Sequence, residues 1–150
     1  MISDAYAIFS RRILGSVAWV LMCLMLLVGC FSPPDVKDLE GRARQYMVER
    51  QKRDWSAVYD DFLDPEVRAG FPKGEFLRRR GGAFDLLSFS IKAAIVNPES
   101  SPREGRVEVV MEAVIPLLTP DGGSQTVRRE LSDPQAWVVR DGIWYVRLKR

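Results

Sequence analysis

Cys30 is the residue whose type and position are best suited to covalent chemistry. It closes the tetrapeptide Leu27-Val28-Gly29-Cys30 at the end of a long apolar run. A thiol becomes a strong nucleophile once it is deprotonated, and a small residue before it lets the chain lie extended in a protease cleft. The other cysteine, Cys23, follows the bulky Met22 and is expected to be an apolar member of the run.

The segment before Cys30 has the layout of an export signal. Arg11 and Arg12 precede residues 13–28, which carry no charged side chain. A positive flank followed by an apolar stretch and small residues is typical of a secretory signal peptide. The two arginines also favour retention of that end in the cytoplasm.

Leu27, Val28, Gly29 and Cys30 together resemble the lipobox of bacterial lipoproteins. The resemblance implies recognition of Leu27, Val28 and Gly29 by the lipoprotein signal peptidase and cleavage before Cys30. It also implies acylation of Cys30, which would carry palmitate-type chains and make membrane lipid its partner. Two or more chains give stable anchoring. Residues 1–29 would then be signal peptide, residues 30–34 the lipidated cysteine and tether, and residues 35–150 the mature domain.

Two other interpretations of the N-terminal segment remain open. The apolar stretch 13–31 falls within the roughly 17–25 residues that can span a bilayer, so an uncleaved anchor is one alternative. An ordinary secretory signal with an incidental Cys30 is the other. Under the lipoprotein interpretation, the protein faces the periplasm from the cell envelope. Phe31 stands where an aspartate would signal retention in the inner membrane of enterobacteria, which favours the outer membrane.

The composition of the chain argues against some classes of function. The 150 residues are 47% hydrophobic and 28% charged, with a formal net charge of +2, which is ordinary for a globular domain. Interspersed charges of both signs argue against a nucleic-acid partner, which needs a clustered basic face. The sequence contains no histidine, the commonest zinc ligand, and we expect no metal site and no cofactor.

The mature part is expected to form helices first and strands second. Apolar residues at spacings of three and four predict helices between residues 35 and 80, with Asp35 and Asp54 as N-terminal caps and Asp64-Pro65-Glu66 as the start of a short turn. Alternation then predicts strands over 87–95, 107–115, 126–131, 136–140 and 143–148. Turns are expected at residues 120–123 and at Ser132-Asp133-Pro134. Asp141-Gly142 predicts a two-residue hairpin that pairs 136–140 with 143–148.

Two segments resemble NTF2-like (cone-shaped, cystatin-type) domains: the helix entry over residues 51–59 and the closing hairpin over residues 137–146. This resemblance implies an α+β fold in which N-terminal helices pack on a curved antiparallel sheet, here preceded by a helical signal segment. A pocket between helices and sheet is implied as well. Such domains serve both enzymes and binding modules, so the fold alone does not define a function.

Four aromatic residues are candidates to line that pocket: Tyr46, Tyr59, Trp137 and Trp144. Aromatic side chains supply much of the surface of ligand sites, although simple core packing is the more frequent role for residues on helix and strand stripes. A Tyr/Asp pair of the ketosteroid-isomerase type would draw on these tyrosines and on Asp60, Asp61 or Asp85. We assign no catalytic residue, because those aspartates are expected to be solvated.

The function expected from the sequence is that of a lipid-anchored envelope protein. Its domain would bind a partner protein, a second copy of itself or a small apolar ligand; the alternative is a periplasmic enzyme with a Tyr/Asp pocket. The arginine run 78–80 is either a solvated helix end or a contact for anionic lipid headgroups.

Overall fold

The computed structural model describes residues 34–80, 84–118 and 122–148. The chain divides into two units, residues 1–33 and residues 34–150, and the described residues all belong to the second. The expected signal peptide and Cys30 therefore lie outside the described residues. Within the described residues, the helices are too short or too polar to cross a membrane.

Helix α2 (Val36–Lys52) is the longest helix of the domain. Its start is a capping box, as the sequence suggests: the Asp35 side chain accepts a hydrogen bond from the backbone N–H of Asp38, and the Asp38 carboxylate accepts one from Asp35. Arg53 ends the helix in the left-handed region, with φ of 61°. The apolar stripe of α2 is buried and consists of Leu39, Ala43, Tyr46 and Met47.

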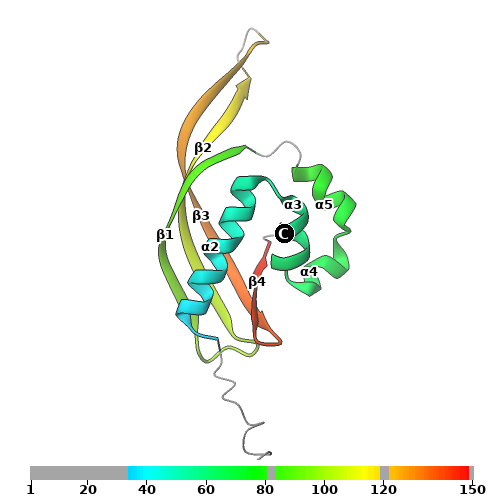
Figure 1. The fold of residues 1–150 in the computed structure, drawn as a ribbon, viewed down its shortest axis with the longest axis vertical. Helices are drawn as coiled ribbons and strands as arrows, with labels where there is room; N and C mark the ends of the chain where they lie inside the picture. The colour runs from blue at the N-terminus through cyan, green and yellow to red at the C-terminus, as the bar shows by residue number, and fades with distance from the viewer. Residues whose placement is uncertain (1–33, 81–83, 119–121, 149–150) are drawn as a thin grey trace, which may run out of the picture. The chain divides into compact units, whose positions relative to one another are not determined.

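A series of short elements follows α2: α3 (Trp55–Ala57), the π-helical turn η1 (Val58–Phe62), α4 (Pro65–Gly70) and α5 (Lys73–Arg80). The predicted cap at Asp54 is confirmed, since its side chain accepts a hydrogen bond from Ala57 N–H. Asp64 caps α4 in the same way and accepts from Glu66 N–H. These elements cluster beside α2 and next to the last strand (Figure 1). They provide one wall of the pocket described below.

Four antiparallel strands form the sheet, in the order β1 (Asp85–Asn97), β2 (Glu104–Leu118), β3 (Ser124–Arg140) and β4 (Ile143–Arg147). Each strand pairs with the one before it in sequence. Helix α2 lies across one face of this sheet, and β2 and β3 extend together beyond it (Figure 1). The core sits between α2, η1 and the inner face of the sheet.

The prediction that buried and exposed side chains alternate strictly along β1 is wrong. The pairing with β2 shifts between Leu86 and Ser88 and again between Ile91 and Ala93. Each bulge moves the following side chains to the opposite face. As a result Ala94 packs against the core, whereas Ile95, expected to be buried, is 61% exposed.

The turn expected at Ser132-Asp133-Pro134 is also wrong, because β3 runs without interruption from residue 124 to residue 140. Pro134 lies beyond the last β3 residue that pairs with β4, which is Ala136. Proline is tolerated at such an edge position because no neighbouring strand needs its N–H. The preceding Asp133 is bound by an arginine of α2.

The predicted closing hairpin is confirmed. Trp137 pairs with Val146 and Val139 with Trp144. Asp141 and Gly142 have φ values of 50° and 78°, as a two-residue type I′ turn requires.

The assignment of an NTF2-like fold is corrected by this architecture. The described residues form a four-stranded meander rather than five separate strands, because residues 126–140 belong to one strand. Leu39, Ala43 and Met47 of α2 have no exposed surface. The expected open cone between helices and sheet is thus filled along α2.

Candidate functional site

The candidate site is a pocket at the C-terminal end of α2, here called the α2–α5 pocket, with a volume of about 190 Å³. Its helical wall consists of Tyr46, Arg50, Trp55, Val58, Phe76 and Arg80. Its strand wall comes from residues 133–135 of β3 and 146–148 at the end of β4. The pocket exists because β4 is short: where it ends, β3 continues and leaves the space open toward α5.

Arg50 and Asp133 form the polar wall of this pocket. The distance from Arg50 Nη1 to Asp133 Oδ2 is 2.5 Å, and Gln135 Nε2 donates to the same carboxylate oxygen at 3.1 Å. Gln135 Oε1 in turn accepts from Trp137 Nε1 at 3.3 Å. This chain of polar contacts links helix α2 to the inner face of β3 through the core.

Tyr46 lies between this wall and the aromatic core. Its ring meets Trp137 edge to face at 5.7 Å, and the Arg50 guanidinium lies 5.4 Å from the ring centre. Burial raises the pKa of Tyr46, and the charge of Arg50 only partly opposes that shift. Burial also lowers the pKa of Arg50, but Tyr46 and Asp133 outweigh this effect and raise it. Tyr46 is therefore a neutral hydrogen-bonding group here and not a ready proton donor.

The apolar part of the pocket comes from the short helices. Phe76 is buried and packs at 5.4 Å against Tyr59. Trp55 is half-buried, and its Nε1 has no hydrogen-bond partner among the described residues. The Arg80 guanidinium lies 5.9 Å from the Trp55 ring centre and 5.4 Å from that of Phe76, within the range of a cation–π contact.

Of the four aromatic residues proposed from the sequence, Tyr46 lines this pocket. Tyr59, Trp137 and Trp144 are buried in the hydrophobic core. The Tyr59 hydroxyl donates to the backbone oxygen of Phe71 at 2.8 Å, so its polar atom has a structural partner. The Trp144 ring packs 3.3 Å from the position that a Cβ at Gly105 would take.

The three aspartates considered for catalysis lie on the surface. Asp60 pairs with Lys73 at 2.5 Å, and Asp85 with Arg53 at 2.8 Å. Asp61 is exposed. None of the three lines the α2–α5 pocket.

Three residues make the pocket polar and are not predicted from the sequence: Arg50, Asp133 and Gln135. Arg50 follows Tyr46 by four positions in a helix, so the spacing placed both on one face. Asp133 was assigned to a turn, and no local pattern could place it opposite Arg50, since the two residues meet only through the packing of α2 on β3.

Asp64 is a second acidic residue removed from solvent, with 1% of its surface exposed. Arg147 Nε lies 3.3 Å from its carboxylate and Arg140 Nε 3.5 Å. The Arg140 Nε proton is not aligned for a hydrogen bond, so this second contact is electrostatic. Asp64 thus fixes η1 and α4 against the end of the sheet.

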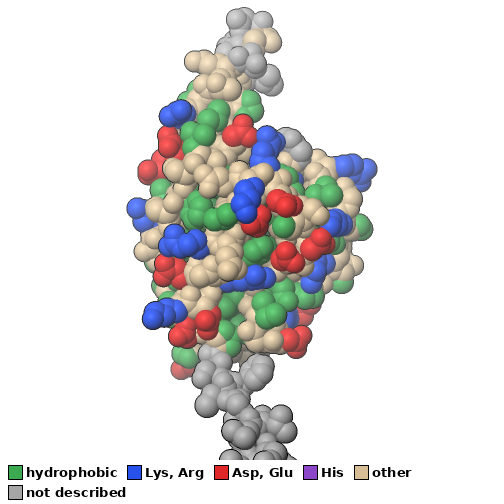
Figure 2. Space-filling view, in the orientation of Figure 1, with side chains coloured by type: hydrophobic (Ala, Val, Ile, Leu, Met, Phe, Trp, Pro, Cys, Tyr) green, Lys and Arg blue, Asp and Glu red, His purple; other side chains and the backbone are tan. Residues whose placement is uncertain are grey.

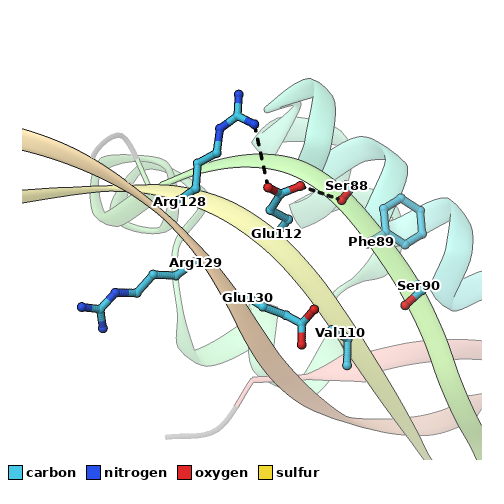
Figure 3. A pocket seen from close by; sticks show the side chains of 8 residues that line it. All are labelled: Ser88, Phe89, Ser90, Val110, Glu112, Arg128, Arg129 and Glu130. Carbon is cyan, nitrogen blue, oxygen red and sulfur yellow. Dashed lines mark hydrogen bonds and ion pairs between the residues drawn. The ribbon is translucent and has the colours of Figure 1, made fainter.

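A shallower hollow lies over β1, β2 and β3, with a volume of about 310 Å³ (Figure 3). Glu112 stands at its centre, 4.0 Å from Arg128 and 3.4 Å from Ser88 Oγ, while Arg129 extends away from it (Figure 3). All three contacting groups are solvated side chains of a sheet face. Basic and acidic side chains are likewise intermixed on the face drawn in Figure 2, with no single-sign surface.

No family model matches the chain, and no curated protein matches its sequence. Among solved structures, the chain is similar to a SEC-C motif containing protein from Rhodopseudomonas palustris, with a TM-score of 0.51 and 17% identity. The match covers 75% of this chain and 77% of that one. At this identity the similarity concerns the fold alone, and it too departs from the NTF2-like assignment.

Proposed function

We propose that this protein is a bacterial lipoprotein of the cell envelope whose domain binds a small, largely apolar ligand in the α2–α5 pocket. The observation that carries the binding part is an aromatic-walled pocket with a polar group at one side. Such a combination of apolar surface and a few convergent polar groups is typical of small-molecule sites.

The anchoring part rests on the sequence around Cys30. The tetrapeptide Leu27-Val28-Gly29-Cys30 follows an uncharged run that is preceded by two arginines. Helix α2 begins at Val36, so the residues between Cys30 and the domain would form a short tether that contains Pro33 and Pro34. The outer membrane, facing the periplasm, remains the proposed destination because residue 31 is phenylalanine.

Binding is favoured over catalysis by the contacts of the carboxylate in the pocket. Asp133 accepts hydrogen bonds from Arg50 and Gln135 on one oxygen, Oδ2. These contacts tie α2 to β3 and support a structural role for Asp133 rather than that of a general base. Tyr46, the other titratable group of a Tyr/Asp enzyme, is a weaker acid than usual because of its burial.

Metabolic labelling with a palmitate analogue tests the anchor. We expect Cys30→Ser to abolish the label and to leave an uncleaved precursor. Cys23→Ser is the matched control, because it removes a thiol from the same apolar run and should leave labelling and cleavage unchanged. Labelling that persists in Cys30→Ser would overturn the lipoprotein assignment.

Ligand binding can be followed with 5-fluorotryptophan in the full-length protein, purified into lipid nanodiscs. Benzamide and benzoate serve as ring-sized probes, and the fluorine signals are assigned by Trp→Phe variants. At least one probe should shift the Trp55 signal in a saturable way, with a smaller shift for the core residue Trp144. Val58→Phe, which fills the pocket, should remove the Trp55 response. A Trp55 signal that neither probe moves would refute the pocket as a ligand site.

A further inference from the structure

Arg80 is the cation at the meeting point of the hollows around α5. It lines the α2–α5 pocket, a small cavity of about 20 Å³ shared with Arg50 and Trp55, and a wide groove along α4 and α5. Its guanidinium lies over the rings of Trp55 and Phe76. A ligand in any of these spaces would meet this charge.

The charge of Arg80 is not neutralised by a carboxylate of residues 34–80, 84–118 or 122–148. The two other arginines of the pocket differ in this respect. Arg50 is paired with Asp133, and Arg147 with Asp64. The pocket therefore carries an excess positive charge, and that charge is located at Arg80.

Trp55 supplies a second unsatisfied donor beside Arg80. Its Nε1 is removed from solvent yet has no acceptor in the described part of the chain, a condition that costs free energy in a folded protein. Trp137 Nε1, by contrast, donates to Gln135. Trp144 Nε1 also lacks a partner among the described residues, but Trp144 does not line this pocket. Within the described residues, the donor of Trp55 is thus unsatisfied.

The volume of the pocket limits the size of that ligand. A dry cavity of about 150 Å³ is sufficient to hold benzene, and the α2–α5 pocket measures about 190 Å³. One substituted six-membered ring fits such a space. Trp55, which is half-buried, offers the main apolar surface that such a ring would contact, because Phe76 and Val58 are each 1% exposed.

We infer that the ligand of the α2–α5 pocket is a single-ring carboxylate, whose ring packs on Trp55 and whose anionic oxygens accept hydrogen bonds from Arg80. A planar guanidinium matches the two oxygens of a carboxylate in geometry and charge. This inference rests on the proposed ligand-binding function and specifies its ligand class.

Benzoate and its neutral isostere benzamide distinguish the charge requirement from binding itself. Their dissociation constants are measured by titration of the Trp55 fluorine signal in the full-length protein in nanodiscs, with empty nanodiscs as the partition control. We expect benzoate to bind at least about tenfold more tightly than benzamide, because it adds a charge-assisted hydrogen bond.

Variants of the arginine run assign the effect to one side chain. Arg80→Gln should weaken benzoate binding at least about tenfold and leave benzamide binding within about twofold. Arg80→Lys keeps the charge and should recover part of the benzoate affinity. Arg78→Gln is the matched control, because Arg78 is an exposed residue of the same helix that does not line the pocket, and it should change neither constant.

Two results would overturn the inference while leaving the pocket as a ligand site. One is equal affinity for benzoate and benzamide. The other is benzoate binding that Arg80→Gln and Arg78→Gln weaken to the same degree, which would indicate a general effect of surface charge. Failure of both probes to bind would instead refute the proposed function on which the inference rests.

Discussion

Arg50 of α2 binds Asp133 of β3 with an N–O distance of 2.5 Å, across 83 positions of sequence. The side chains are 12% and 29% exposed, respectively. The pair joins the last turn of the helix to the strand at the position where the sequence suggests a chain reversal. It therefore closes the pocket wall, at a position where β3 is held extended by the pairing of Asp133 with Val109 of β2.

Removal of one partner should show how much this pair contributes. Asp133→Asn leaves the Arg50 charge largely buried, so we expect a loss of about 2 kcal/mol in the free energy of unfolding. Asp85→Asn breaks the exposed pair with Arg53 and should change stability by less than about 1 kcal/mol. Urea unfolding measures both values. Equal losses in the two variants would mean that the buried pair contributes no more to stability than the exposed pair.

Gly105 lies where α2 packs tightly on the sheet. A Cβ at this position would lie 2.6 Å from Leu39 Cδ2 and 3.3 Å from the Trp144 ring. We expect Gly105→Ala to destabilise the domain by about 1–3 kcal/mol, because overpacking shifts its neighbours. Gly41→Ala is the control: it lies in α2 with open space around it, and it should stabilise the helix by up to about 1 kcal/mol. Thermal unfolding that ranks the two variants in the reverse order would contradict this packing.

Gly142 has a φ of 78° in the closing turn. Gly142→Val places a β-branched residue in the left-handed region, and we expect a loss of about 1–3 kcal/mol. Gly142→Asn should lose less, since asparagine tolerates this region better than other non-glycine residues. The free energies of unfolding of the two variants are compared by urea denaturation. An unchanged midpoint for Gly142→Val would argue against the strained turn.

Because of Tyr46, we expect the stability of the domain to depend on pH in the alkaline range. Burial raises its pKa in the folded state above the usual value near 10. The contribution of the neutral Tyr46 side chain to the free energy of unfolding is therefore complete below about pH 10. This contribution is lost as the pH rises from the pKa of the unfolded state toward the raised pKa of the folded state. We expect the melting temperature of the wild type to fall more steeply between about pH 9 and 11 than that of Tyr46→Phe. Parallel curves for the two proteins would show that Tyr46 does not titrate differently on folding.

Local sequence determined the elements whose geometry depends on near neighbours. Asp35 and Asp54 predicted the helix starts, and the capping contacts reach only three residues along the chain. Asp141-Gly142 predicted the last hairpin and its register, because a two-residue turn leaves one way to pair the flanking strands. The lipobox at residues 27–30 is also a local pattern, and it remains a prediction.

Tertiary packing decided what local patterns could not. The bulges of β1 moved Ala94 inward and Ile95 outward, and alternation alone contains no signal for a bulge. Residues 132–134 have the composition of a turn, yet Arg50 of a distant helix binds Asp133 and the chain stays extended. The pocket of Arg80, Trp55 and Tyr46 likewise depends on where β4 ends relative to α2 and α5. Such contacts join residues far apart in the chain, and their free energy outweighs the small local preferences that a sequence pattern expresses.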